Sequence, residues 1–284
     1  MLGKLASLHP LVYENVLRCA LQEDLGRAGD LTTDAIVPPN LEVSAGVISR
    51  SPGCIAGVEV AAYTFRLLDP SVRVDVGVSD GSTVQSGDTL AVVKGLSRAL
   101  LTAERTALNI LGHLSGIATA THNIVGKIEN SLTKVVCTRK TTPGLRLLEK
   151  YAVRAGGGFN HRFGLDDAVL IKDNHLIIAG GIRQAVEEVR KVIGHTVKIE
   201  VEVDTLEQLE ETLEVQVDAV LLDNMELETV KKAVQIVDKR LVVEVSGGIT
   251  PESAVELAAV GVDLISLGWL THSAPALDVS LDIS

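Results

Sequence analysis

The sequence contains few aromatic side chains: three Phe, three Tyr and one Trp among 284 residues. Proteins that bind single-stranded nucleic acids stack the bases on aromatic rings, so this composition offers little for that mode of binding. Basic residues are outnumbered as well, because 26 Lys and Arg stand against 37 Asp and Glu and the net charge is −11. General binding of DNA or RNA is therefore not expected.

Cysteines and long apolar segments are also scarce. Cys19, Cys54 and Cys137 are an odd number and lie far apart, which fits neither a disulfide framework nor a zinc site. No apolar run approaches the roughly 18 residues that a membrane helix needs. The N-terminus lacks the apolar block and cleavage site of a secretory signal. We expect a cytoplasmic protein with buried thiols and no membrane contact.

The composition is that of a folded globular protein with an aliphatic core, since 46% of the residues are hydrophobic. The first part of the chain mixes strand-like runs with helix candidates, which predicts an α+β unit. Within it, the turns and strands of residues 81–95 predict a β-hairpin. A helix from about Arg98 to Glu129 is expected to lead into the second half.

From Lys134 onward, apolar runs alternate with amphipathic stretches, which is typical of βα units around a parallel sheet. The runs are Val135–Thr138, Ala168–Ile171, Lys198–Val203, Ala219–Leu222, Leu241–Val245 and Leu264–Leu267. No GxGxxG segment opens the first unit, and at least six strands are expected. A barrel is therefore favoured over a dinucleotide-binding sheet.

Basic residues concentrate in residues 138–172, where seven Lys and Arg stand against three Asp and Glu. Three of them, Arg146, Lys150 and Arg154, recur at every fourth position. This spacing is typical of a solvated helix face. We therefore expect these three side chains to be exposed rather than to bind a ligand.

The other basic residues of this segment lie where apolar strands end. Arg139, Lys140 and Lys172 follow two of the expected strands, and barrels build their active sites at the carboxyl ends of strands. The segment Gly156–Arg162 lies between them and joins three glycines to a histidine and an arginine. Because guanidinium groups match carboxylate and phosphate, these residues predict a site for an anionic ligand.

Acidic residues alternate with aliphatic ones in the third strand, which turns Glu200 and Glu202 to one face. In a barrel covered by helices this face must be the interior, where unpaired charge is costly. Asp223 ends the next strand, so Glu202 and Asp223 are candidate ligands for Mg²⁺. An internal salt-bridge network with Lys140 and Lys172 is the alternative, and both can hold at once.

Two late turns predict a phosphate site. Ser246–Gly248 leads from a strand to Thr250 and Pro251, which fit the N-cap and first position of a helix. The next strand ends at Leu267–Gly268, with His272 close behind. Phosphates in βα barrels often bind in the loops after the last strands, beside a helix N-terminus. No residue stands in a nucleophile motif, so covalent catalysis is not indicated.

Taken together, long segments over almost the whole chain resemble the quinolinate phosphoribosyltransferase family. The matching segments are Ala103–Asn109, Ser115–Thr119, Thr138–Arg146, Gly156–Arg162, Ile171–His175, Glu200–Asp204, Leu221–Asn224, Ser246–Ile249 and Leu270–Asp278. The resemblance implies an α/β protein with an N-terminal α/β sandwich domain over residues 1–112, to which a tail of residues 275–284 returns. It implies an irregular, open α/β barrel over residues 113–274.

The same resemblance implies a reaction. A phosphoribosyl group passes from phosphoribosyl pyrophosphate to quinolinate, and decarboxylation gives nicotinate mononucleotide, CO₂ and pyrophosphate in de novo NAD biosynthesis. Mg²⁺ is the implied cofactor. The implied assembly is a homodimer, or a larger oligomer built from it, in which Arg105 is donated to the partner's active site.

Site residues are implied position by position. Those for quinolinate are Arg105, Arg139, His161, Arg162 and Lys172. Those for phosphoribosyl pyrophosphate are Thr138, Lys140, Ser246, Gly247, Gly248, Leu267, Gly268, Trp269 and His272. The implied metal ligands are Glu202 and Asp223, which form the catalytic set with Lys140 and Lys172. The resemblance favours Glu202 over Glu200 as metal ligand. Trp269 replaces the small residue expected in this family, so its contact is expected through the backbone.

Two other functions remain open. A related phosphoribosyltransferase could accept another pyridine or aromatic acid, for example nicotinate without decarboxylation, although the implied cations are more than one carboxylate needs. A non-catalytic module that binds a phosphorylated metabolite is suggested by residues 81–95, which look slightly like a biotinyl or lipoyl domain. The tip of that segment has no Lys to carry a prosthetic group.

Overall fold

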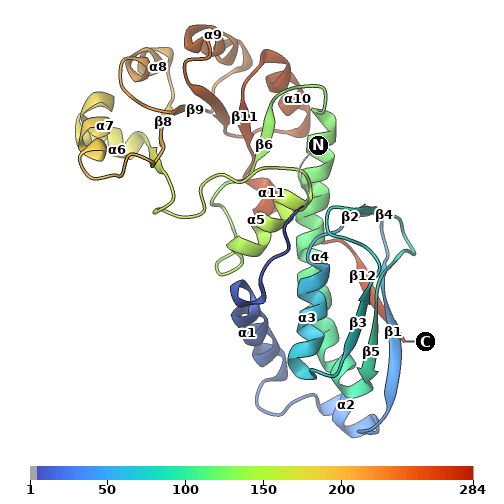
Figure 1. Cartoon of the computed structure of the whole chain (residues 1–284). Coiled ribbons are helices and arrows are strands. Elements are labelled where there is room, and N and C mark those ends of the chain that lie inside the picture. Colours follow the sequence, from blue (N-terminus) through green and yellow to red (C-terminus); the bar gives the residue numbers. More distant parts are fainter. Residues whose placement is uncertain (1–4, 284) are drawn as a thin grey trace. The chain divides into compact units, whose positions relative to one another are not determined.

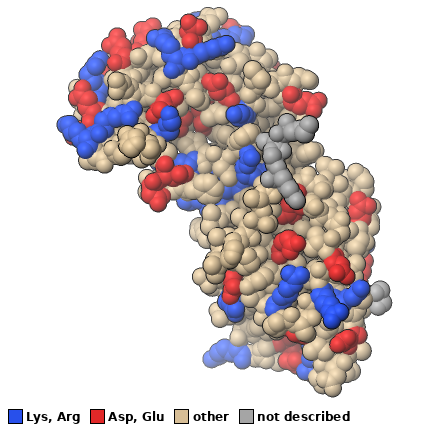
Figure 2. Space-filling model, viewed as in Figure 1, with Lys and Arg blue, Asp and Glu red and all other residues tan. Residues whose placement is uncertain are grey.

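The computed structural model describes residues 5–283 and has two compact units (Figure 1). The first unit contains the chain up to Asn123, Lys140–Gly158 and the residues from Trp269 onward. The second contains Ile124–Arg139 and Phe159–Gly268. Within the described residues, none of the helices combines the length and apolar character that crossing a membrane requires. Acidic and basic side chains are interspersed over the face drawn in Figure 2.

The first unit is built on a four-stranded antiparallel sheet in the order β12-β1-β5-β3. Its strands are β1 (Glu42–Ser49), β3 (Arg73–Val76), β5 (Thr89–Leu96) and β12 (Val279–Ile283). The last strand of the chain pairs with the first, so Ala45 lies opposite Ile283. A separate pair joins the short strands β2 (Gly53–Cys54) and β4 (Thr83–Val84).

Helices complete the first unit. They are the 3₁₀ helix η1 (Pro10–Val12), α1 (Glu14–Leu25), α2 (Leu31–Ile36), α3 (Val58–Leu68), α4 (Ser97–Lys127, whose last turn belongs to the second unit), α5 (Arg146–Ala155) and α11 (Trp269–His272). The core between sheet and helices is aliphatic apart from Phe65, and Leu90, Val93, Leu100 and Leu111 are fully buried in it. This matches the small number of aromatic residues in the sequence.

Two local expectations for this unit are wrong. Residues 81–95 do not form a hairpin, because β4 pairs with β2 whereas β5 pairs with β1 and β3. The basic residues of α5 do not form a solvated face either. Lys150 is fully buried, and Arg154 donates from Nη1 to the Gly158 carbonyl at 2.6 Å. The strand pairing is decided by residues distant in sequence, which short-range patterns do not contain.

The second unit is a six-stranded parallel sheet in the order β6-β11-β10-β9-β8-β7. Its strands are β6 (Lys134–Val136), β7 (Val169–Ile171), β8 (Ile199–Val203), β9 (Ala219–Asp223), β10 (Val242–Ser246) and β11 (Leu264–Ser266). Each lies within one of the six predicted apolar runs or extends it by one residue. Strands β6 and β7 are the two edges of the sheet, as expected for an open barrel.

Helices of this unit follow the strands and lie on the outer side of the sheet (Figure 1). They are α6 (Asp173–Ala179), α7 (Ile182–Arg190), α8 (Leu206–Leu213), α9 (Leu227–Val237) and α10 (Pro251–Val260). Local sequence sets where they begin. Thr250 accepts a hydrogen bond from the Ser253 amide and Pro251 takes the first helical position, as predicted.

Strand register defines the face that the helices leave uncovered. Side chains alternate along a strand, and residues paired in register share a face. Val201 and Val203 of β8 are fully buried, whereas Glu200 and Glu202 point to the opposite, inner face. Leu221, the partner of Glu202 on β9, is also the partner of Glu244 on β10. The inner face therefore carries acidic side chains on more than one strand.

Candidate active site

Charged and small polar side chains meet at the carboxyl edge of the second unit's sheet. Asp223, at the end of β9, lies in register with Ser246 at the end of β10. Lys172 directly follows β7, and its Nζ forms an ion pair with Glu202 Oε2 of β8. Because all six strands are parallel, their carboxyl ends lie along one edge, where open α/β sheets bind ligands. The strand ends predicted from the sequence are thus brought together.

The pair of Lys172 and Glu202 can open toward a ligand. The Lys172 side chain is 46% exposed, whereas that of Glu202 is 11% exposed. An exposed lysine gains little from one surface ion pair, so an anion of higher charge can draw it away. The salt bridge expected between Lys172 and the interior acids is present, and it involves Glu202.

Glu202 and Asp223 suit a hard divalent cation. They lie on the inner face of adjacent strands, with Asp223 two residues beyond the register partner of Glu202. Asp223 Oδ2 accepts a hydrogen bond from the side-chain Nδ2 of Asn224 at 2.6 Å. Mg²⁺ commonly binds one or two carboxylates and completes its octahedron with water and substrate phosphates. Two carboxylates at an open edge fit that donor set.

Two arginines form the basic part of this edge. Arg162 is half-buried, and its Nη1 donates to the Ala168 carbonyl at 2.9 Å. Burial, followed by the positive charge of Arg139, lowers the pKa of Arg162 below the usual arginine range. Two neighbouring guanidinium groups that repel each other in a partly desolvated place are stabilised by an anion between them. The charge of Arg139 thus acts on Arg162, which places both arginines at this part of the edge.

A buried cluster lies deeper on the inner face. His161 Nε2 is 3.0 Å from Glu200 Oε2 and 3.6 Å from Glu244 Oε1. Glu244 is only 2% exposed, and burial together with the charge of Glu200 raises its pKa to about 8. On the other side of the ring, His161 Nδ1 accepts the Arg162 backbone N–H at 2.7 Å. The cluster therefore connects the barrel interior with the arginine edge.

Sequence reasoning missed Glu244. The only signal available was a single acid in an otherwise apolar strand, between Val243 and Val245. Asn224 ends one of the matching segments, and the sequence predicts no role for it. Its backbone φ is +52°, and its N–H donates to the Ser246 carbonyl at 3.0 Å. Asn224 therefore joins the ends of β9 and β10.

The glycine turn after β10 has the backbone that its sequence suggests. Gly247 has φ +97° and Gly248 has φ +55°, both in the region that favours glycine. A Cβ on Gly247 would lie 2.1 Å from Asn224 Oδ1, whereas a Cβ on Gly248 would meet nothing within 4 Å. The turn then enters α10, ten residues long, at Thr250. Backbone amides at such a helix start suit phosphate oxygens.

Several residues predicted for the site belong to the first unit. Arg105 is exposed on α4, and the part of the chain that the structure describes gives it no salt bridge. The carbonyl of the exposed Lys140 accepts a hydrogen bond from Thr271 Oγ1 at 2.8 Å. His272 Nδ1 lies 2.6 Å from Ser273 Oγ, and Trp269 begins the short helix α11. Thr138, Leu267 and Gly268 belong to the second unit.

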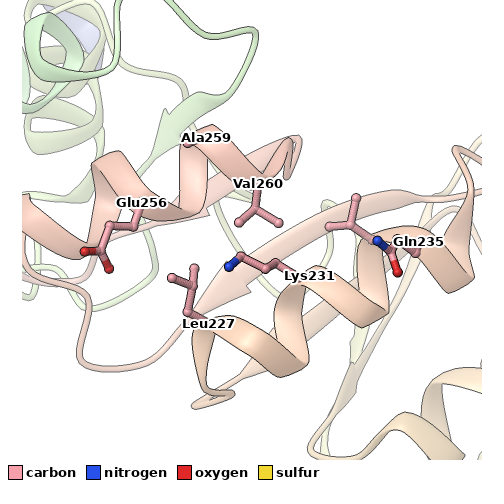
Figure 3. A pocket seen from close by; sticks show the side chains of 7 residues that line it. Leu227, Lys231, Gln235, Glu256, Ala259 and Val260 are labelled. Carbon is pink, nitrogen blue, oxygen red and sulfur yellow. The ribbon is translucent and has the colours of Figure 1, made fainter.

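Another hollow of the second unit lies on its outer side, between α9 and α10 (Figure 3). It has a volume of about 430 Å³ and is lined by Leu227, Lys231, Val234, Gln235, Glu256, Ala259 and Val260. The lining combines aliphatic side chains with one lysine and one glutamate. It contains none of the strand-end residues, so it is separate from the candidate site.

Comparison with known proteins gives a consistent family. Two family models match, the N-terminal domain of quinolinate phosphoribosyl transferase over residues 30–115 and its C-terminal domain over residues 117–282. The chain is 45% identical over 277 residues to the nicotinate-nucleotide pyrophosphorylase [carboxylating] of Mycobacterium leprae, covering 95% of this chain and 96% of that protein.

More distant organisms give the same result. The chain is 38% identical over 294 aligned residues to a mitochondrial quinolinate phosphoribosyltransferase [decarboxylating] of Nicotiana glauca, with 97% of this chain and 83% of that protein covered. The solved structure of the nicotinate-nucleotide pyrophosphorylase from Francisella tularensis superimposes with a TM-score of 0.94 at 38% identity. That match covers the full length of both chains.

Proposed function

The chain belongs to the quinolinate phosphoribosyltransferase family, and from this we propose the reaction that its site performs. It is a pentosyltransferase that joins the phosphoribosyl group of phosphoribosyl pyrophosphate to quinolinate. The products are nicotinate mononucleotide, CO₂ and pyrophosphate, on the de novo route to NAD. The observation that carries this proposal is the paired guanidinium groups of Arg139 and Arg162 beside the carboxyl ends of strands that bear Lys172, Glu202 and Asp223.

Quinolinate carries two adjacent carboxylates, which explains the number of cations. We assign Arg139, Arg162 and Lys172 to these carboxylates, with Arg105 completing the set. Lys172 turns from Glu202 toward the substrate, and its exposed side chain permits this movement. A substrate with one carboxylate leaves at least one of these cations unmatched, so the site should prefer the dicarboxylate.

The phosphoribosyl donor is assigned to the neighbouring strand ends. The residues proposed to hold it are Thr138, Lys140, Ser246, Gly247, Gly248, Leu267, Gly268, Trp269 and His272. Glu202 and Asp223 would hold Mg²⁺, which neutralises the pyrophosphate when bound. The catalytic set is then Lys140, Lys172, Glu202 and Asp223. Its members act by positioning and by electrostatic stabilisation of the leaving pyrophosphate.

The chemistry needs no protein nucleophile. The pyridine nitrogen of quinolinate attacks the anomeric carbon of ribose, and the bond from that carbon to pyrophosphate breaks with its electron pair. The ring then carries a positive charge. When the C2 carboxylate leaves as CO₂, the ring accepts the electron pair of the broken bond, and a proton replaces the carboxylate at C2. The arginines orient the ring during both steps.

We further propose a homodimer in which each Arg105 serves the partner's site. Arg105 is exposed and has no salt bridge among the described residues of its own chain. Each unit also exposes large aliphatic side chains, Leu31 and Ile36 at 71% and 74% in the first and Ile177 and Ile178 at 77% and 86% in the second. Exposed apolar groups of this size are typical of protein interfaces.

Complementation tests this assembly. Inactive Arg105→Ala mixed with inactive Lys172→Ala should regain partial activity, because hybrid dimers contain one site with both residues intact. Mass spectrometry of differently labelled chains checks that subunits exchange. No regained activity despite exchange would show that Arg105 does not act across the interface.

We also propose a cytoplasmic location, supported by three free cysteines, of which two are buried.

Incubation of the purified protein with quinolinate, phosphoribosyl pyrophosphate and Mg²⁺ tests the function, with nicotinate as the parallel substrate. Release of CO₂ and formation of nicotinate mononucleotide from quinolinate alone are expected. Turnover of nicotinate alone would favour the related phosphoribosyltransferase. Binding of phosphoribosyl pyrophosphate without turnover of either acid would favour the non-catalytic module. Omitting Mg²⁺ in the presence of a chelator should abolish turnover.

A further inference from the structure

The inner face of the second unit contains two acids for which the reaction has no direct use. Glu200 on β8 and Glu244 on β10 are 8% and 2% exposed and lie on opposite sides of β9. Leu221 of β9 lies between these strands on the same face. Two carboxyl groups this close in an apolar interior are costly unless their hydrogen bonds are satisfied. The free energy cost of burying these two carboxyl groups suggests that they have a role beyond packing.

The partner of both acids is His161, whose hydrogen bonds define its tautomer. Its Nδ1 accepts the Arg162 N–H at 2.7 Å, so that nitrogen has no room for a proton. The proton of the neutral ring therefore sits on Nε2, which donates to Glu200 Oε2 at 3.0 Å. Glu244 Oε1, 3.6 Å from the same nitrogen, has no hydrogen-bond partner among the described residues. Both ring nitrogens are thus engaged within the chain.

The cluster holds the backbone of Arg162, and a separate hydrogen bond holds its guanidinium group. The backbone amide of Arg162 is tied to the ring of His161, and its guanidinium is tied to the Ala168 carbonyl at 2.9 Å. The charge of Arg139 opposes this position, since it is one of the causes that lower the pKa of Arg162. Before an anion binds, hydrogen bonds within the chain therefore keep Arg162 near Arg139 despite their repulsion. The buried cluster supplies the hydrogen bond to the Arg162 backbone.

We propose that His161, Glu200 and Glu244 are positioning residues that hold Arg162 beside Arg139, ready for the second carboxylate of the substrate, and that His161 does not itself contact the substrate. The inference rests on the proposed function for the identity of the substrate. It differs from the role that family resemblance gives His161, which is direct contact with quinolinate. The chain preorganises its dicarboxylate site from within the barrel.

Two variants of Glu244 test the proposal by steady-state kinetics. Glu244→Leu removes the buried carboxyl and should raise the KM for quinolinate about 10-fold or more, with the KM for phosphoribosyl pyrophosphate unchanged within about twofold. Glu244→Gln keeps the shape and a donor. Because burial raises the pKa of Glu244 to about 8, the neutral amide resembles the native group at pH 7. This variant should restore the quinolinate KM to within about threefold of the wild-type value.

Val245→Ala is the matched control. Val245 is the next residue on β10, is 2% exposed and faces the helices instead of the barrel interior. Its truncation should lower the melting temperature. It should not raise the KM for quinolinate relative to the KM for phosphoribosyl pyrophosphate. Equal changes in both KM values for Glu244→Leu, or no change in either, would overturn the proposal. A wild-type protein that turns over neither acid would instead refute the proposed function, so the two failures are distinguishable.

A measurement on the unmodified protein covers the case in which Glu244→Leu does not fold. ¹⁵N NMR of histidine-labelled protein, with His161→Gln to assign the resonance, should show a ring protonated at Nε2 and unprotonated at Nδ1. Saturating quinolinate should leave that pattern unchanged. A ring that changes its protonation pattern when quinolinate binds would overturn the proposal. So would a stoichiometric metal ion whose removal raises the quinolinate KM, because the three side chains could also hold a cation.

Discussion

Replacement of Gly247 by alanine should damage this protein more than the same change one residue later. Gly247 has φ +97°, and an added Cβ would lie 2.1 Å from Asn224 Oδ1 and 2.8 Å from the Asn224 backbone nitrogen. Gly248 has φ +55°, and its added Cβ would meet nothing within 4 Å. Both substitutions add the same methyl group at a left-handed backbone position, so they differ mainly in the space around that group.

The expected magnitude follows from three contributions. A left-handed backbone costs a non-glycine residue about 1–2 kcal/mol. Moving Asn224 away also breaks its hydrogen bond to the Ser246 carbonyl, worth about 1 kcal/mol, and strains the turn by about 1–3 kcal/mol. The reduced freedom of the unfolded chain returns about 0.4–1 kcal/mol. Gly247→Ala should therefore cost about 2–6 kcal/mol, whereas Gly248→Ala, which keeps only the backbone cost and the unfolded-chain gain, should cost about 0–2 kcal/mol.

Thermal unfolding and kinetics measure this difference. At about 2–4 °C for each kcal/mol in a chain of this size, Gly247→Ala should lower the melting temperature by about 4–24 °C. It should also raise the KM for phosphoribosyl pyrophosphate, since the amides of the turn are displaced. Asn224→Gly in the same chain removes the nearest clash and should restore part of the stability. Equal melting temperatures for Gly247→Ala and the wild type would refute the reasoning, and so would a larger loss for Gly248→Ala.

Three further changes have directions that the structure sets. Arg139→Ala and Arg162→Ala should each raise the quinolinate KM about 10–100-fold and leave the affinity for phosphoribosyl pyrophosphate nearly intact. Calorimetry that shows an equal loss of both affinities would contradict the assignment. Because Glu244 has its pKa raised from 4.5 to about 8, the folded protein retains a proton that the unfolded chain releases, so its free energy of unfolding should fall as the pH rises from about 4.5 to 8. Glu244→Gln should lack that decline in thermal melts recorded across the same range, and parallel curves would exclude this origin. Asp30→Ala removes the Oδ1 that accepts the Thr33 amide at 2.9 Å at the start of α2, and denaturant titration should show a loss of about 1 kcal/mol; no loss would mean that this cap is replaced by water.

Periodicity in the sequence predicted most of the second unit. Six apolar runs became the six parallel strands, because a strand buried beneath helices must be apolar at every second position. The same rule predicted that Glu202 points inward, and parallel connection places the strand ends at one edge. Thr250 and Pro251 begin a helix for a purely local reason. Chemistry that depends on position within a βα repeat could therefore be inferred before the structure was known.

Pairing partners could not be inferred in this way. The turn-rich segment at residues 81–95 has the local pattern of a hairpin, yet β4 and β5 join different partners. Lys150 has the spacing of a solvated face and is fully buried. The strand pairing depends on elements far away in the chain, and the burial of Lys150 shows that tertiary packing outweighs local preference.

The sequence by itself determined the family, the alternation of strands and helices, and the residue types that meet at the strand ends. Each of these follows from short-range patterns or from long ordered motifs. Only the tertiary structure decided that Glu244, an isolated acid in an apolar strand, joins Glu200 and His161. It also decided that the salt bridge expected for Lys172 goes to Glu202. These relations depend on distances between side chains of different strands. Burial and the charge of neighbouring groups, rather than residue type, determine which group holds a proton and which cation can bind an anion.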